Sequence, residues 1–182
     1  MLVSANVGDS RAVLSRGGMA IALTKDRKPN DPDEKKRIEK LGGRVQWCGP
    51  REVKSDKSKS TVKKDGKKRK KRTGGVYRIN GNLALSRAIG DRSEKPLVSS
   101  QVDINEIEFD PKQDEFIIIA SDGLWDVISN QDSVDFCHSA LSRAKKNHEI
   151  IPDVKNHLAK LLVEEAQRRG SMDNISAVII WF

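Results

Sequence analysis

Several common features are scarce in this sequence or missing from it. No apolar run approaches the roughly 20 residues of a membrane-spanning helix, and the first residues lack the basic and apolar regions of a secretory signal. The two cysteines, Cys48 and Cys137, lie far apart and outside any CxxC spacing. We therefore expect no membrane span and two reduced thiols, in a protein of the cytoplasm, the nucleus or both. A single disulfide between the two cysteines is the alternative.

Positive charge is concentrated in one segment. The chain has 182 residues and a net charge of +8, and residues 51–72 hold twelve Lys or Arg against three acids, so the remainder is close to neutral (22 basic against 23 acidic). This distribution argues against a nucleic-acid-binding domain with a broad basic face. We expect one domain over 1–182 that carries a basic, disordered insertion at 50–74. The stretch Lys67–Arg72 is a candidate nuclear import signal or site for an acidic partner, RNA or anionic lipid, and a solvated, dispensable loop is the alternative.

The order of the expected elements favours an α+β fold. Strands are predicted within 2–24, with a hairpin at Gly17–Gly18, and at 102–109, from 115 onward and at 174–182. A helix is predicted at 31–42, with Asp31 as its cap, Glu34 completing a capping box and Gly42 as its stop. A helical turn is expected after Asn80–Gly81. Two amphipathic helices are predicted after Ser129 and at 153–169, the second burying Leu158, Leu161 and Leu162. Since strands and helices do not alternate regularly, a doubly wound parallel sheet is disfavoured.

Aspartates stand at the ends of two apolar strands. Asp122 closes "FIIIAS", and Asp173 comes just before "NISAVII". If these strands are antiparallel neighbours, both carboxylates reach the same edge of the sheet, where Asp126, after a turn eased by Gly123, and Asp9 of "VGDSR" could join them. Oxygen ligands without a nearby His or Cys suit Mg²⁺ or Mn²⁺ better than zinc.

An aspartate at a strand end has a more ordinary interpretation. A lone Asp in such a position is most commonly a turn or cap residue, and Asp9 could form a simple Asx-turn with Ser10. The spacing does exclude one rival: haloacid-dehalogenase-type phosphatases need a DxD, whereas here the next acid after Asp122 lies four positions on. The residue pattern alone therefore reaches a candidate divalent-metal site and leaves the turn interpretation open.

Five motifs occur in an order that resembles a known family. "ANVGDSRAVL", "LTKDRKPNDPDEKKRIEKLGGRV", "RINGNLALSRAIGD", "IIIASDGLWDVIS" and "GSMDNISAVII" together resemble the metal-dependent protein serine/threonine phosphatases of type 2C, over nearly the whole chain apart from the basic segment. The resemblance implies an α-β-β-α sandwich of two mainly antiparallel sheets flanked by helices. It also implies about two or three Mg²⁺ or Mn²⁺ ions in a complete domain and phosphoprotein substrates, with a monomeric full-length parent.

The resemblance also assigns roles to individual residues. Asp122 and Asp173 resemble ligands of the metal centre, and Asp126 and Asp9 resemble ligands of a third, looser metal. Asn174 resembles a residue beside the attacking water. The implied reaction is hydrolysis of phosphoserine or phosphothreonine by a metal-activated water, without a phosphoenzyme. Trp125 is expected in the core and not at the substrate.

The chain departs from the family pattern in two places. It has no "MED"-like or "DGHGG" segment and no early arginine for the substrate phosphate, and it begins inside an expected strand. We therefore expect a fragment, a partial gene model or a short isoform, incomplete at its N-terminus, with exposed sheet surface. An inactive fragment or pseudophosphatase with a binding or regulatory role is the alternative function, and a binding protein that works through the basic segment is another. The basic segment falls in the family's flap region, and Arg27 stands where the family often has His.

Overall fold

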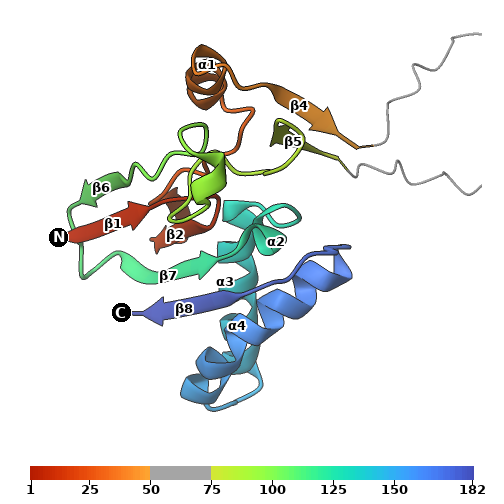
Figure 1. Ribbon diagram of the computed structural model, residues 1–182. Helices are drawn as coiled ribbons and strands as arrows, with labels where there is room; N and C mark the ends of the chain where they lie inside the picture. Colours follow the sequence, from red (N-terminus) through yellow and green to blue (C-terminus); the bar gives the residue numbers. More distant parts are fainter. Residues whose placement is uncertain (50–74) are drawn as a thin grey trace, which may run out of the picture.

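The structure is a computed structural model that describes residues 1–49 and 75–182. The basic insertion at 50–74, with Lys67–Arg72, lies outside the described residues, and so its role stays a prediction, as does the extent of the domain. The elements follow the chain in Figure 1 in this order: β1 (Leu2–Asn6), β2 (Arg11–Arg16), β3 (Met19–Ala22), α1 (Pro32–Lys40), β4 (Val45–Cys48), β5 (Val76–Ile79), η1 (Arg92–Glu94), β6 (Asp103–Ile107), β7 (Asp114–Ala120), α2 (Asp122–Trp125), α3 (Asn130–Lys146), α4 (Ile151–Arg168) and β8 (Ala177–Trp181).

A four-stranded antiparallel sheet forms the centre of the molecule. Its strand order is β3-β2-β7-β8, and Ile118 in the middle of β7 pairs with Val13 on one side and with Ile179 on the other. The predicted hairpin is confirmed, since Gly17 and Gly18 turn β2 into β3 with φ values of 53° and 79°, a region that favours glycine. The strands next to Asp122 and Asp173, β7 and β8, are antiparallel neighbours, which is the condition under which the two carboxylates reach the same edge.

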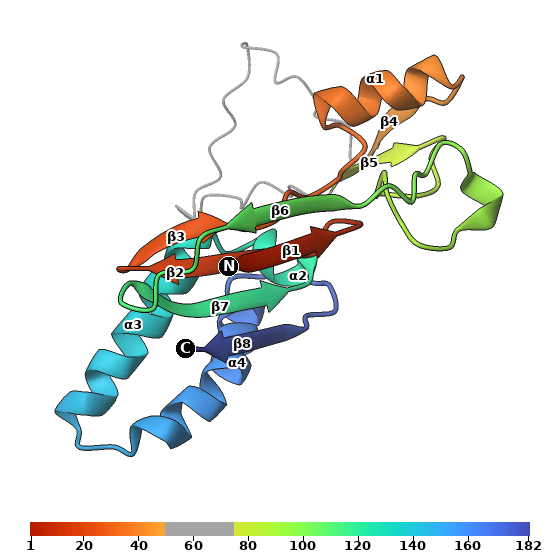
Figure 2. The same ribbon diagram turned by 90° about the vertical axis from the view of Figure 1, so that its left-hand side faces the viewer.

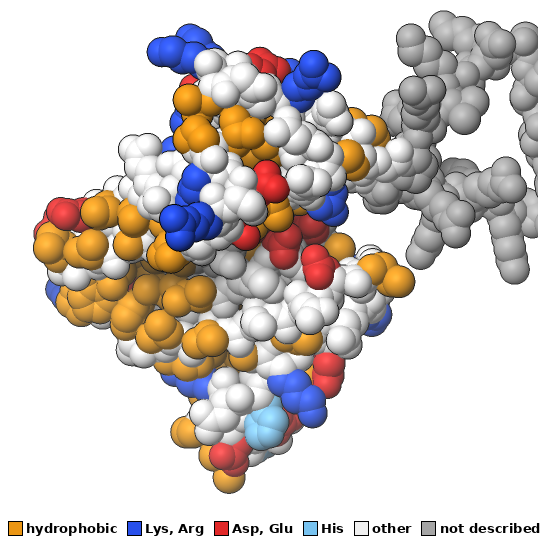
Figure 3. Space-filling view, viewed as in Figure 1, with side chains coloured by type: hydrophobic (Ala, Val, Ile, Leu, Met, Phe, Trp, Pro, Cys, Tyr) orange, Lys and Arg blue, Asp and Glu red, His pale blue; other side chains and the backbone are white. Residues whose placement is uncertain are grey.

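A second sheet, of β1 and β6, lies over the inner face of the first (Figure 2). The segment at Gly8–Asp9 does not close a hairpin, because it carries the chain from β1 in one sheet to β2 in the other. The two sheets meet in an apolar cluster of buried and half-buried side chains: Leu2, Ala12, Leu14, Ile21, Leu23, Ile107 and Ile117. A cavity of about 330 Å³ remains between the two sheets. Figure 3, which has the view of Figure 1, shows apolar side chains gathered on the side of the molecule where the two sheets lie.

Helices α3 and α4 cover the outer face of the four-stranded sheet. Phe116, Ile118 and Ala120 of β7 pack with α3 and α4 residues that include Cys137 and Leu162. Ser129 caps α3 by accepting a hydrogen bond from the Asp132 amide, as predicted. The sequence-based prediction was wrong for Leu161, which is partly exposed; α4 buries Leu158, Leu162 and Ala166 instead.

The α+β fold class is confirmed by this layered arrangement of helices and antiparallel sheets. In the described residues the outward side chains of the smaller sheet, Val3 and Ile104, are exposed. Cys48 and Cys137 are both free thiols, which agrees with the expected absence of a disulfide. No helix in the described part of the chain has the length and apolar character needed to cross a membrane.

Helix α1 and the antiparallel strand pair β4–β5 lie together above the sheets (Figure 1). Ile38, Ile79 and Val98 make its core. Asp31 accepts a hydrogen bond from the Asp33 amide and caps α1 as predicted. The capping box was wrong, however, because the Glu34 carboxylate turns inward to arginines (below). The helical turn expected after Asn80–Gly81 was also wrong: residues 83–90 are irregular, since their backbone groups bond to neighbouring loops, as in Ser86 N–H to Arg27 O at 2.9 Å.

Candidate functional site

The first site residue, Asp122, follows the central strand directly. β7 ends at Ala120, and Asp122 opens the single helical turn α2. The indole N–H of Trp125 donates to Ala120 O at 2.9 Å and to Arg11 O at 3.2 Å. Trp125 is buried, as predicted, and these bonds fix α2 against the ends of β2 and β7. The Asp122 backbone is thus attached to the two central strands of the sheet.

Asp173 and Asn174 precede β8 and lie against the same turn. Ser121 joins the two segments, because its hydroxyl accepts from Ser176 N–H at 3.1 Å and donates to Asn174 O at 3.2 Å. The backbones approach so closely that a β-carbon built at Gly123 would lie 2.5 Å from Asn174 O. The sequence had suggested that Gly123 eases a turn. The structure shows that glycine is required here for close packing.

The predicted aspartates influence one another electrostatically. Burial raises the pKa of Asp9, and the negative charge of Asp122 raises it further. Burial likewise raises the pKa of Asp122, and the charges of Asp126 and Asp173 add to the effect. Asp9, Asp126 and Asp173 thus lie close enough to Asp122 for their charges and that of Asp122 to influence one another. Their roles as metal ligands stay a prediction.

A lysine that the sequence reasoning missed lies among these acids. Lys28 Nζ is 2.8 Å from Asp126 Oδ1. Burial by itself would lower the pKa of Lys28, but the hydrogen bond to Asp126 and the charges of Asp9 and Asp122 raise it. A lysine in a loop gives no signal by itself, and only its place in the motif "TKDRKP" could have drawn attention to it.

The donors suit a hard cation, although the side chains do not enclose one. Among residues 1–49 and 75–182, no three His, Cys, Asp or Glu side chains converge on a point that could hold a metal ion. The candidate donors are carboxylate oxygens, which Mg²⁺ and Mn²⁺ prefer. A cation would also relieve the repulsion that raises the pKa values of Asp9 and Asp122. The residue types therefore fit a divalent metal centred on Asp122.

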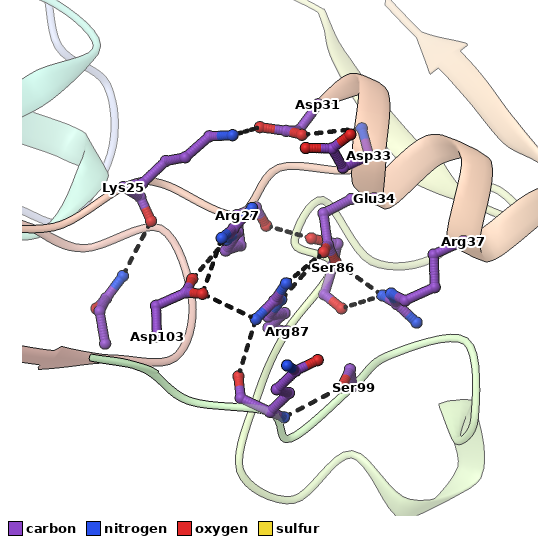
Figure 4. Close-up of polar contacts among 12 residues, drawn as sticks. Lys25, Arg27, Asp31, Asp33, Glu34, Arg37, Ser86, Arg87, Ser99 and Asp103 are labelled. Carbon is purple, nitrogen blue, oxygen red and sulfur yellow. Dashed lines mark hydrogen bonds and ion pairs between the residues drawn. The ribbon is translucent and has the colours of Figure 1, made fainter. Parts of the chain in front are cut away.

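A network of ion pairs holds the loop that carries Lys28 (Figure 4). Arg27 donates two hydrogen bonds, of 2.5 and 2.8 Å, to the carboxylate of Asp103 at the start of β6. Arg87 donates to the same carboxylate at 3.2 Å and to Glu34 of α1 at 2.6 Å. Arg37 donates a further hydrogen bond to the Glu34 carboxylate at 2.8 Å. The network therefore ties α1, the 86–87 segment, β6 and the loop before Lys28 into one body.

The charge on Glu34 is strongly favoured within this network. Burial would raise the pKa of its carboxyl, but hydrogen bonds from Arg87, Arg37 and Ser86 outweigh burial and lower that pKa to about 2. Glu34 is almost fully buried and Arg87 nearly so. Removing either partner would leave the other buried with only one weaker or more exposed ion pair, to Arg37 for Glu34 or to Asp103 for Arg87.

An open cleft of about 770 Å³ runs beside the aspartates. One wall is formed by Gly123, Asp126, Val127 and residues 169–173, and the other by Cys48, Gly75, Val76 and Arg78 near the β4–β5 hairpin. Asp126 and Asp173 thus face a space large enough to admit a side chain from another molecule.

Comparisons with known proteins agree on one family. A family model described as "Protein phosphatase 2C" matches residues 1–175. "Probable protein phosphatase 2C 69" of Arabidopsis thaliana is 42% identical over 181 residues, which are 100% of this chain and 40% of that protein. "Probable protein phosphatase 2C 8" of Oryza sativa subsp. japonica is 42% identical over 183 residues, 98% of this chain and 38% of that protein.

Solved structures give the same result. A C. elegans sex determining protein is similar with a TM-score of 0.72 and 25% identity, over 97% of this chain and 36% of that one. A serine-threonine phosphatase 2C from Toxoplasma gondii is similar with a TM-score of 0.68 and 26% identity, over 99% of this chain and 54% of that one. The chain spans about 40% of the length of the curated relatives named above.

Proposed function

The chain belongs to the protein phosphatase 2C family, and we propose that it supplies part of the catalytic centre of a metal-dependent protein serine/threonine phosphatase. The observation that carries the proposal is the gathering of Asp9, Asp126 and Asp173 around Asp122 in a chain that matches the family over residues 1–175. The substrates would be phosphoserine and phosphothreonine side chains of other proteins, encountered in the cytoplasm, the nucleus or both.

Mg²⁺ or Mn²⁺ is the proposed cofactor. Asp122 and Asp173 would hold the ions at the centre, while Asp126 and Asp9 would hold a further ion beside them. When bound, such ions neutralise phosphate oxygens and acidify a water molecule. The proposal draws on the carboxylate chemistry of these residues and on the raised pKa values of Asp9 and Asp122.

The residues of the chain itself would orient the reaction. Asp122 and Asp173 keep their separation because β7 and β8 pair directly and Ser121, next to Asp122, bonds to Asn174 and Ser176 of the segment before β8. The side chain of Asn174 would lie beside the attacking water and orient it through its amide. The cleft lined by Asp126, Asp173 and the β4–β5 hairpin would receive the phosphorylated segment of the substrate.

Mn²⁺-dependent hydrolysis of a phosphothreonine peptide tests the proposal. We expect Asp122→Asn to lower the rate at least about 100-fold, because the loss of a central ligand removes most of the electrostatic stabilisation. Asp135→Asn is the matched control, since Asp135 is an exposed residue of α3, and we expect the wild-type rate. Equal rates in wild type and Asp122→Asn would contradict the proposal and favour a binding role for this chain.

A further inference from the structure

Lys28 takes a position that a cation in the carboxylate cluster would also use. Its ammonium group is bonded to Asp126 at 2.8 Å, and its positive charge lies near enough to Asp9 and Asp122 to interact with both carboxylates. One side chain therefore offsets part of the negative charge of three carboxylates that come from two different turns. A site without a divalent ion has in Lys28 a neutralising charge of its own.

The loop that carries Lys28 is fastened to the turn that carries Asp9. The Arg27 amide donates to Gly8 O at 2.9 Å, while the Arg27 guanidinium is held by the Asp103 carboxylate through two hydrogen bonds. Lys28 thus extends from a fixed backbone toward Asp126, and its position does not depend on the reach of a free surface chain. This arrangement distinguishes it from a lysine that meets an acid by chance.

We propose that Lys28 is an internal counter-ion that competes with a divalent cation for Asp126 and thereby sets the cation affinity of this end of the cluster. The inference rests on the proposed function only in taking that cation to be Mg²⁺ or Mn²⁺. A divalent ion that binds beside Asp126 must displace the ammonium group or accept its repulsion. Either event weakens binding, by a factor on the order of ten for one unit charge a few ångströms away.

An ordinary surface ion pair is the competing explanation. The side chains of Lys28 and Asp126 are 33% and 54% exposed, and pairs with this exposure commonly contribute little to stability. Lys25 offers a matched comparison. It belongs to the same loop and is paired with Asp31 at 2.7 Å, with the lysine 56% exposed, but Asp31 caps α1 and is not part of the cluster.

The first experiment is calorimetric titration of the purified chain with Mn²⁺ for wild type, Lys28→Gln and Lys25→Gln. We expect Lys28→Gln to tighten Mn²⁺ binding about tenfold, with a smaller gain at high salt because screening weakens the repulsion. Lys25→Gln should bind as wild type does. Equal affinities in wild type and Lys28→Gln, or Mn²⁺ binding in neither, would overturn the proposal.

The second experiment needs no metal. Thermal melting in EDTA should show a lower Tm for Lys28→Gln, because the carboxylates then repel one another without compensation. Asp126→Asn in the Lys28→Gln background should restore part of the loss, so the two changes are not additive. Strict additivity would contradict the counter-ion role. Since neither measurement involves hydrolysis, an inactive chain that shows both effects would count against the proposed function and leave the role of Lys28 intact.

Discussion

A β-carbon at Gly123 would lie 2.5 Å from the main-chain oxygen of Asn174. The first turn after β7 and the segment before β8 are therefore pressed together without room for a methyl group. Asp122 and Asp173 are the immediate neighbours of these two positions, so the same contact sets the distance between the two carboxylates.

Gly123→Ala should damage the site and the fold together. The added methyl must push the Asn174 segment away, and overpacking of this kind destabilises proteins by about 1–3 kcal/mol. Hydrolysis should fall further than stability suggests, because Asp122 and Asp173 move apart. Urea unfolding and peptide hydrolysis check both effects.

Gly42→Ala is the matched control for that variant. Gly42 also resists substitution, through its φ of +83°, but nothing lies within 4 Å of the position that a β-carbon would take. We expect a loss of about 1 kcal/mol from backbone strain and an unchanged rate per folded molecule. A rate that falls as far as in Gly123→Ala would contradict the role of the Gly123 contact.

Asp122→Asn should stabilise the metal-free chain even as it abolishes hydrolysis. Burial and the charges of Asp126 and Asp173 raise the pKa of Asp122, so its ionised form disfavours the folded state. The penalty is absent below the carboxyl's ordinary pKa and grows as pH rises through the folded value. In EDTA the variant should therefore gain roughly 1–3 °C in Tm at pH 7 and little near pH 3. A lower Tm at pH 7 would contradict this prediction and show that Lys28 compensates the Asp122 charge in full.

Glu34→Gln should destabilise the protein strongly, although Glu34 belongs to a helix at the surface. The change leaves the Arg87 and Arg37 guanidinium groups without the carboxylate that they share at 2.6 and 2.8 Å, and such losses reach about 3–5 kcal/mol for buried pairs. Glu39→Gln in the same helix is the control, since Glu39 is exposed and 3.8 Å from Lys35; we expect a change below about 0.5 kcal/mol. Urea unfolding of both variants measures the difference.

The pH dependence of stability should carry the signature of Glu34. Its folded pKa of about 2 lies below the ordinary value of 4.5, so its stabilisation is complete above pH 4.5 and is lost as pH falls toward 2. Asp103 and Asp114 have lowered pKa values too, so the wild-type chain should weaken steeply on acidification. Unfolding free energies measured between pH 5 and pH 3 should fall less in Glu34→Gln than in wild type. Parallel curves would contradict the assignment.

The sequence predicted those parts of the fold that depend on local pattern. The apolar run before Asp122 and the apolar strand after Asp173 could be recognised because buried strands have a simple composition, whereas their pairing was only a condition that the structure then met. Caps such as Asp31 and Ser129 were also predictable, since a cap bonds to its own helix.

Long-range contacts explain what the sequence could not predict. Glu34 has the spacing of a capping box, but its carboxylate binds two arginines instead, Arg37 and the buried Arg87, which is 53 residues away. Lys28 has no distinguishing feature in the sequence, because its partner Asp126 lies 98 residues away. In each case the deciding partner is remote in sequence.

The remoteness of these partners governs how the molecule can form. Ser15 of β2 meets Glu115 of β7 across 100 residues, and Lys28 meets Asp126 across 98. A ribosome that adds about 5–20 residues per second leaves β2 without its central partner for roughly 5–20 s. A high contact order slows folding further. The carboxylate cluster is consequently a late product of folding, and the unpaired β2–β3 hairpin is the segment that a chaperone would have to shield in the meantime.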